Sequence, residues 1–598
     1  MNNIFIKKSR KLLRFVVYML LPIGGAWVGG SCTDWNDHYE ADSDLTATQS
    51  TTLWQNIEQN GNLSQFASLL KRVGYDQHLS SAQSYTIWAP QNDTFDYAAW
   101  QSASDSVLQQ NFIENHIAKT NFLASGKLDK QRVFMLNKKM MIFDGTAGNY
   151  TMQGISVTQP NIASINGMLH MLQSNIPYLS NIKETLNDLS NPIDSFALYF
   201  QKYDKKELDR SKSVQGPSKN GEITYLEAIY NEDNDLYSLY KAQVQREDSN
   251  YTMIIPSNNA WTKAVKTIKS YFNYAPQFDV VQATAAGNDT TIKVKLLDKD
   301  QLQDSIVRYM LCHDLFYSNN MYDNGKLALL KSGNKPAVDS LVSTLRSKIY
   351  SEDAAALFEG AKRMDCSNGA AWVTDDSLRI RTWMSWNPEL KIECETNGML
   401  FKSLYADTRN VTIPVGAKNP KVTGSVSKSG YLEAKPSLDG AHPDLFFYLP
   451  GVRSTTYAVY VVMLPSVIIN GTIPDTTVVT IGGKDSTVIK TNRMTAIMGY
   501  AQSDGTKKTL SMNTTVTNRN NPSQIDTVYV GDFTFPIAYE GTGEYYPFLN
   551  LKSRYQSSEK NYFNDVLRLD CIILRPKDLD TYVKQHPEYK YDTDRDSK

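Results

Sequence analysis

Histidine and cysteine, the side chains that most often carry catalysis or bind metals, are few and scattered in this sequence. Seven histidines are spread over 598 residues, and no two of them form an HExxH or HxxxH pair. The five cysteines include no CxxC pair and none at metal-ligand spacing from a histidine. A general base or a metal ligand needs a partner within reach. Neither residue type therefore predicts a catalytic or metal-binding site.

Other local motifs for chemistry also fail on inspection. The stretch GGKDST at Gly482 lacks the upstream glycine of a phosphate-binding loop and has Asp485 where that loop needs a hydroxyl. No GxSxG segment supplies a nucleophile elbow. The C-terminal DTDRDSK alternates carboxylates but has neither the glycine nor the final glutamate of a calcium loop. The sequence predicts a protein that is not an enzyme and has no metal or cofactor.

The interior of the protein accounts for several of these side chains. His116 and His313 lie in apolar stretches with helical spacing, which favours a hydrogen-bonded core histidine over a functional one. Cys571, in LDCIIL, is expected to be a small core residue. Cys366 and Cys394 could form a disulfide if their strands prove to be neighbours.

The N-terminus has the pattern of an export signal. Basic residues from Lys7 to Arg14 precede the apolar stretch FVVYMLLPIGGAWVGG, which is short and glycine-rich for a permanent membrane span. The sequence GGSC then resembles the end of a bacterial lipoprotein signal. This resemblance implies that residues 1–31 are a signal peptide and that Cys32 is lipidated. The alternative is an uncleaved anchor with an incidental cysteine.

Residues 32–50 are predicted to be an acidic tether. Acidic residues from Asp34 to Asp44 occur with few aliphatic ones, a composition that does not build a core. An acidic patch after a lipidated cysteine resembles the signal that sends Bacteroidota lipoproteins to the outer face of the outer membrane. The alternative is an acidic linker that carries no targeting signal.

One phrase occurs twice and indicates an internal duplication. YTIWAPQNDTF begins at Tyr85 and YTMIIPSNNAW begins at Tyr251; each predicts a strand, a proline turn and a capped helix start. A helix follows each copy, and an NGML turn follows later at 166–169 and at 397–400. Three landmarks in the same order predict two related domains.

The order of these landmarks resembles the fasciclin domain, a fold of a β-wedge with helices. IWAPQNDTF and INGMLHML match its two sequence boxes in the first unit; IIPSNNAW and TNGMLFKS match in the second, with Phe401 in place of the second-box histidine. The family's Tyr-His dipeptide becomes Asn115-His116 and Cys312-His313. The resemblance implies fasciclin-like domains at 51–180 and at 181–415, the second with an insertion from about Tyr274 to Arg379.

From about Thr412 the sequence becomes rich in β-branched and aromatic runs separated by Gly, Asn and Asp, which predicts an antiparallel sandwich at 416–598. Its last strand, LRLDCIILRP, resembles that of jelly-roll, galactose-binding-like domains. In such domains exposed aromatics often bind sugars. The stretches FFYLP and EYYPFLNL are therefore candidates, and Tyr545 and Tyr546 are the proposed ligand or partner contacts. The alternative is that these aromatics fill the core.

Together these features predict an α+β, multidomain surface protein: two fasciclin-like domains followed by an all-β, jelly-roll-like sandwich. A net charge of -1 gives no reason to expect a nucleic-acid partner. The chain resembles fasciclin-domain lipoproteins of Bacteroidota that accompany a TonB-dependent transporter and its lid lipoprotein (SusC and SusD type). This implies a non-catalytic accessory subunit for glycan or peptide uptake, anchored in the outer membrane and facing the cell exterior. The alternative is an independent glycan-binding or adhesion protein.

Overall fold

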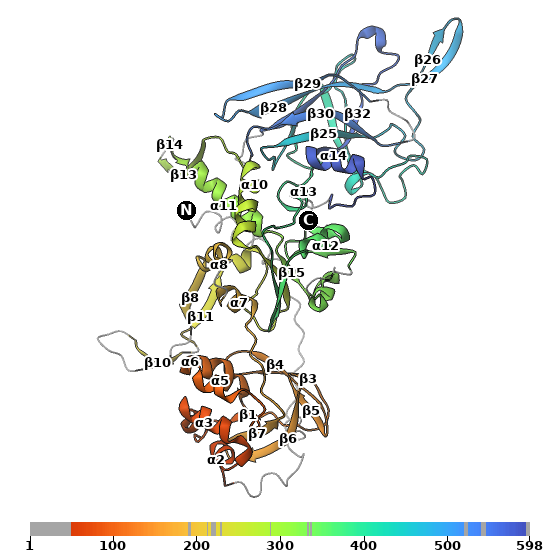
Figure 1. Ribbon diagram of the computed structural model, residues 1–598. Helices are drawn as coiled ribbons and strands as arrows, with labels where there is room; N and C mark the ends of the chain where they lie inside the picture. The colour runs from red at the N-terminus through yellow and green to blue at the C-terminus, as the bar shows by residue number, and fades with distance from the viewer. Residues whose placement is uncertain are drawn as a thin grey trace, which may run out of the picture. The chain divides into compact units, whose positions relative to one another are not determined.

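The computed structural model describes residues 50–188, 193–211, 213–216, 223–227, 230–286, 289–331, 334, 338–518, 524–539 and 546–593. The predicted signal peptide 1–31 and nearly all of the tether, including Cys32, lie outside these ranges. The chain divides into two compact units, Met1–Tyr178 and Leu179–Lys598. Figure 1 shows them in chain order from red to blue.

The first unit is built on a seven-stranded sheet in the order β2-β1-β7-β6-β5-β4-β3. Its strands are β1 (Tyr85–Pro90), β2 (Ile117–Lys119), β3 (Leu128–Phe134), β4 (Met140–Thr146), β5 (Asn149–Met152), β6 (Ile155–Ser164) and β7 (Gly167–Leu172). Its helices are α2 (Leu53–Glu58), α3 (Ser64–Arg72), α4 (Tyr75–His78), α5 (Tyr97–Ser102) and α6 (Asp105–Leu108). The buried faces of α2 and α3 pack with β1 and β7 in one apolar cluster.

The first copy of the repeated phrase forms the centre of this sheet. Strand β1 is buried along its whole length and pairs in parallel with β7, with Tyr85 opposite Gly167. Gly167 has a φ of +153°, and a Cβ there would lie 2.0 Å from the carbonyl oxygen of Tyr85. The close approach of the two strands therefore requires glycine. The capped helix start predicted after the proline turn is α5, whose N-cap Asp96 accepts from the N–H of Ala99.

The second unit begins with the same arrangement, built from a four-stranded sheet in the order β15-β12-β19-β18. These strands are β12 (Tyr251–Ile255), β15 (Phe316–Ser318), β18 (Lys362–Cys366) and β19 (Gly369–Val373). The helices of this part are α7 (Ile182–Asp188), α8 (Asp194–Gln201), α9 (Asp235–Leu239), α10 (Asn258–Ser270), α11 (Lys299–Cys312), α12 (Ser351–Leu357) and α13 (Thr382–Ser385). Two-stranded hairpins complete it: β8 (Asp204–Leu208) with β11 (Tyr230–Asn234), β9 (Val214–Gln215) with β10 (Tyr225–Glu227), β13 (Gln277–Ala286) with β14 (Asp289–Leu297), and β16 (Ser340–Val342) with β17 (Lys348–Tyr350).

Two expectations for this second domain are corrected. Strand β12 pairs in parallel with β19, and Tyr251 lies opposite Gly369, so the equivalent of the first NG turn is Asn368–Gly369 and not Asn397–Gly398. The strands around Asn397 pair with strands of the sandwich instead, so sandwich strands begin at Leu390, ahead of residue 416. The expected insertion also contains α11, β15, β18 and β19, which are core elements of the domain.

The C-terminal part is a sandwich of two antiparallel sheets. One has the order β22-β23-β32-β25-β30, with β20 also paired to β32, and the other has the order β21-β24-β31-β28-β29. The strands are β20 (Leu390–Glu393), β21 (Leu400–Leu404), β22 (Ala406–Thr412), β23 (Gly430–Pro436), β24 (Asp444–Tyr448), β25 (Thr456–Met463), β28 (Asn492–Ala501), β29 (Lys507–Asn518), β30 (Asp526–Thr534), β31 (Phe548–Ser553) and β32 (Leu567–Pro576). A hairpin of β26 (Thr476–Ile481) and β27 (Lys484–Ile489) and a final helix α14 (Lys577–Gln585) are added. One apolar core fills the space between the sheets.

Candidate functional site

The outer face of the five-stranded sheet carries aromatic side chains. In β24, Leu445 and Phe447 lie in the sandwich core, so the alternation of a strand turns Phe446 to the opposite face. In β31 the same alternation turns Phe548 outward. A register shift in β21 between Leu400 and Lys402 places Phe401 beside both of these rings.

Phe401, Phe446 and Phe548 form one continuous group, named here the aromatic face. Their ring centroids lie 6.2 Å (Phe401 to Phe446), 6.0 Å (Phe401 to Phe548) and 5.7 Å (Phe446 to Phe548) apart. All three rings are half-buried. Gly499 of the neighbouring β28 lies under the third ring, because a Cβ at this glycine would be 2.2 Å from a ring carbon of Phe548. The sequence therefore leaves room for the ring to lie flat against the sheet.

Polar side chains stand beside the rings on the same face. Asn550 donates from Nδ2 to Asp444 Oδ1 at 2.5 Å, and Lys552 Nζ lies 3.4 Å from Asp444 Oδ2. Lys402 Nζ lies 4.8 Å from the centroid of the Phe446 ring. The three rings are inclined to one another by 57–68°, and the face combines this apolar surface with a carboxylate, an amide and two ammonium groups. This is the chemistry of a site for a ligand with both apolar and polar surfaces.

Of the two predicted contact residues, Tyr545 lies outside the described residues and Tyr546 lies beside the aromatic face. The Tyr546 ring is 5.5 Å from Phe548, and Lys507 Nζ is 5.2 Å from its centroid. Its hydroxyl lies within hydrogen-bond distance of the carbonyl oxygens of Tyr500 and Lys508, the latter at 2.8 Å. The hydroxyl is therefore used within the fold. The stretches FFYLP and EYYPFLNL contain Phe446 and Phe548 of this face.

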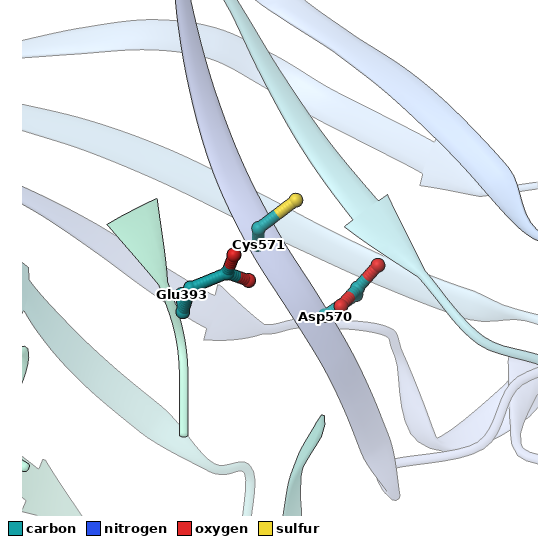
Figure 2. Close-up of side chains that lie close together, drawn as sticks. All are labelled: Glu393, Asp570 and Cys571. Carbon is teal, nitrogen blue, oxygen red and sulfur yellow. The ribbon is translucent and has the colours of Figure 1, made fainter. Parts of the chain in front are cut away.

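A second group of polar side chains lies close together on the other sheet, where the sequence predicted no site. Glu393 of β20 stands opposite Cys571 of β32, and the register of β32 against β25 shifts between Leu569 and Ile572. One donor atom from each of Glu393, Asp570 and Cys571 lies within 4.8 Å of the others. Figure 2 shows the three side chains close together, Glu393 on one strand and Asp570 and Cys571 on the other. Glu393 lies far from Asp570 and Cys571 in the sequence, so no local sequence motif predicts that they come together.

The turn Ser427–Ser429 covers this carboxylate–thiol cluster. The backbone N–H of Ser427 lies 3.2 Å from both Asp570 carboxylate oxygens, and the Ser427 hydroxyl donates to Glu393 Oε1 at 2.6 Å. Lys428 Nζ lies 4.0 Å from Glu393 Oε1. Burial, together with the nearby negative charge of Glu393, raises the pKa of Asp570 to about 7. Burial also raises the pKa of Cys571 above its ordinary value.

Two histidines of the first domain, His116 and His170, are buried and held by backbone groups. His116 Nδ1 lies 2.7 Å from the carbonyl oxygen of Phe112, and its Nε2 accepts from the N–H of Ile176 at 2.9 Å. His170 is held in the same manner between the carbonyl of Phe122 and the N–H of Asn161, at 2.9 and 3.1 Å. Each ring is therefore fixed as the neutral tautomer, and burial lowers both pKa values to about 4. In the second domain His313 contacts the buried Asp314 at 2.9 Å.

The four cysteines within the described part of the chain are buried, and no disulfide joins them. Cys366 ends β18 in the second fasciclin-like domain, whereas Cys394 follows β20 and lies in the sandwich core. Their strands are not neighbours, so the possible disulfide between Cys366 and Cys394 is not formed.

Comparison with known proteins bears on the first domain most directly. Residues 61–176 match the fasciclin domain family. The repeated sheet of the second unit and the two packed sheets that follow complete the fold class: α+β and multidomain, with two fasciclin-like domains and a jelly-roll-like sandwich. No catalytic family is matched.

Similar solved structures include an adhesion molecule and carbohydrate-binding modules. The domain pair of the insect cell adhesion molecule fasciclin I is 14% identical, with 54% of this chain and 99% of that chain covered and a TM-score of 0.19. The C-terminal family 22 carbohydrate-binding module of Clostridium thermocellum Xyn10B is 11% identical over 31% of this chain and 94% of its own, with a TM-score of 0.17. The C-terminal CBM6 of LamC from Zobellia galactanivorans is 12% identical over 31% and 98%, with a TM-score of 0.13.

Among the curated proteins, no sequence matches the chain. Within the described ranges, no helix is both long and apolar enough to cross a membrane.

Proposed function

We propose that this protein is a non-catalytic binding protein that recognises a carbohydrate through the aromatic face of its sandwich. The observation that carries the proposal is the group formed by Phe401, Phe446 and Phe548 beside Asp444 and the side chains bonded to it. The C–H groups on the flat side of a sugar ring pack well on phenyl rings, while its hydroxyls need donors and acceptors at the edge. This face provides the rings, and Lys402 and Lys552 provide donors that reach solvent beside them.

The polar side chains of this face favour binding over hydrolysis. Glycoside hydrolysis requires two carboxyl groups on either side of the scissile bond, one of them free to give or take a proton. Asp444 is instead held by Asn550 at 2.5 Å and by Lys552 at 3.4 Å. Both oxygens of this carboxylate are therefore engaged within the fold.

The sequence supports an exported setting for this activity, and we include it in the proposal. The basic and apolar segment before Cys32 favours lipid attachment at that cysteine, with the body of the protein outside the outer membrane. There it would act as an accessory subunit of a TonB-dependent transporter and a SusD-like lipoprotein, supplying a binding surface for the glycan that is taken up. An independent surface adhesin that binds glycan is the second candidate, since the aromatic face would serve either role.

The binding proposal is tested with the full chain in mild detergent on an array of plant and microbial oligosaccharides, followed by calorimetry with the best oligosaccharide. Phe446→Ala and Phe548→Ala should each weaken binding about tenfold or more, because an aromatic contact is worth roughly 0.5–1.5 kcal/mol beyond its buried area. Phe134→Ala, at a ring 56% exposed on β3 of the first domain, is the matched control and should leave affinity unchanged. Sugar binding that survives both sandwich substitutions would overturn the assignment of the site.

The setting is tested separately. Purification of the native protein from outer membranes should recover a transporter and its lid lipoprotein in stoichiometric amounts, and recovery of the protein alone would favour the adhesin. Cys32→Ala should release the protein from membranes. Retention after a carbonate wash would count against lipid anchoring.

A further inference from the structure

The carboxylate–thiol cluster lies in the interior of the sandwich, and the charges of Lys391 and Lys428 act near it. Glu393 is 6% exposed, Asp570 is 2% exposed and Cys571 is 1% exposed. Glu395, two residues along from Glu393, adds a further carboxylate whose charge acts on Asp570. Lys428 forms a salt bridge with the cluster, since its Nζ lies 4.0 Å from Glu393 Oε1. Its side chain is 53% exposed.

The hydrogen bonds of the cluster leave one buried oxygen without a partner. The Ser427 hydroxyl satisfies Glu393 Oε1, and the Ser427 N–H faces Asp570. Glu393 Oε2, by contrast, has no hydrogen-bond partner among the described residues, although it is shielded from solvent. A buried carboxylate oxygen left unpaired destabilises the fold. A bound cation would offset that cost, because it would satisfy this oxygen and neutralise the charge at the same time.

We propose that Glu393, Asp570 and Cys571 bind one divalent cation of the zinc class. The donor set decides the class: a thiolate with two carboxylates suits zinc, whereas calcium and magnesium take oxygen ligands. The three donor atoms already lie within 4.8 Å of one another (Figure 2). Bonds of about 2.0–2.3 Å to zinc require the donors to draw in by roughly an ångström, which side-chain rotation provides. Binding replaces the proton on the Cys571 sulfur, which passes to the buffer.

The position of the cation site within the fold indicates its consequence. β20 is the first strand of the sandwich and β32 the last of its strands in sequence, and they pair with Glu393 opposite Cys571. A cation held by both strands would join the two ends of the sandwich and stabilise it by mass action. The aromatic face lies on the other sheet, so removing the cation should lower the stability of the sandwich without removing the residues that contact ligand.

The test uses the full chain in mild detergent, stripped of metal with a chelator and titrated with Zn²⁺, Ca²⁺ and Mg²⁺ by calorimetry. We expect Zn²⁺ to bind at one equivalent, with Cys571→Ala weakening binding at least tenfold. Co²⁺ in place of Zn²⁺ should give a thiolate-to-metal charge-transfer band that Cys571→Ala abolishes. Cys366→Ala, which removes a buried thiol in the second fasciclin-like domain, is the matched control and should leave both signals intact.

Glu393→Gln separates loss of the site from loss of the fold. This substitution keeps the shape of the side chain and removes its charge, so it should weaken Zn²⁺ binding at least tenfold while leaving the Tm of the metal-free protein unchanged or higher. Absence of one-equivalent Zn²⁺ binding would overturn the proposal. It would equally be overturned by Zn²⁺ binding that survives both substitutions, or by Ca²⁺ binding with no response to Zn²⁺.

Discussion

In both fasciclin-like domains a buried asparagine side chain bonds to backbone groups beside the central strands, an arrangement named here the asparagine clamp. The side chains that pack beside this clamp differ between the two domains. In the first domain the buried Asn166 accepts from the N–H of Leu53 at 2.8 Å and donates to two carbonyl oxygens of the chain before β1. In the second, Asn368 accepts from the N–H of Ile182 at 3.0 Å and donates to the carbonyls of Val244 and Arg246.

The side chains beside the clamp have diverged. His170 lies opposite Trp88 across the first parallel pair, whereas Trp372 lies opposite Ile254 across the second. The residue before β2 is His116, and the residue before β15 is Leu315. Both histidine positions of the first domain are therefore apolar in the second. The fold needs the asparagine and the glycine that follows it, while the histidines are one of two ways to fill the core around them.

The largest expected effect comes from the two glycines. Gly167→Ala and Gly369→Ala should each destabilise their own domain by on the order of 4 kcal/mol, because the new Cβ would lie 2.0 and 1.9 Å from a backbone oxygen and the φ values are +153° and +137°. Hydrogen exchange of peptides from each domain in the full chain measures this locally. Gly126→Ala, at a positive φ but with open space around it, controls for conformation alone. Near-normal protection in either variant would show that the parallel strand pair can move apart.

The asparagine clamp should give the next largest effect, and the same effect in both domains. Asn166→Ala and Asn368→Ala each remove three side-chain hydrogen bonds and leave buried backbone groups unsatisfied, at a cost of about 3 kcal/mol. Loss of exchange protection should centre on α2 and β1 in one variant and on α7 and β12 in the other. A large effect in one domain with little in the other would show that the clamp supports only one of them.

This comparison also marks how far the sequence could be interpreted. The repeated phrase predicted β1 and β12 correctly, because alternating apolar residues stopped by proline leave little choice of local structure. The second NG turn was misplaced, since NGML at 397 resembles the first copy in letters while SNGAAWV at 367 resembles it in pairing. Parallel pairing depends on contacts distant in sequence, which a short string does not reveal.

The candidate sites were predictable in part, for a similar reason. The stretches FFYLP and EYYPFLNL identified the strands of the aromatic face, but which ring faces outward depends on which neighbour enters the core, so Phe446 and Phe548 were passed over for tyrosines. The carboxylate–thiol cluster depends on a register shift in β32 and on pairing between the first and last sandwich strands. The register shift and the strand pairing cannot be predicted from the sequence of β20 or of β32 alone.

The smallest expected effect is a loss of stability at low pH, and the two domains should differ in it. The folded pKa values of His116 and His170 are about 4, below the ordinary 6.5, so the unfolded chain binds more protons than the folded one between these values. Stability of the first domain should therefore fall as the pH drops from 6.5 toward 4, by about 1.4 kcal/mol for each histidine at pH 5.5. Protonation would set a new N–H against the N–H of Ile176 or Asn161, which explains the direction.

Hydrogen exchange at pH 7 and pH 5.5, corrected for the intrinsic rate, compares the two domains within one chain. Protection around β1 and β7 should weaken at the lower pH more than protection around β12 and β19, where Leu315 and Trp372 occupy the equivalent positions. His116→Gln should remove about half of the pH response, because His170 would still titrate. Equal weakening in both domains would mean that carboxylates common to both govern acid stability, and the divergence beside the clamp would then be a matter of packing alone.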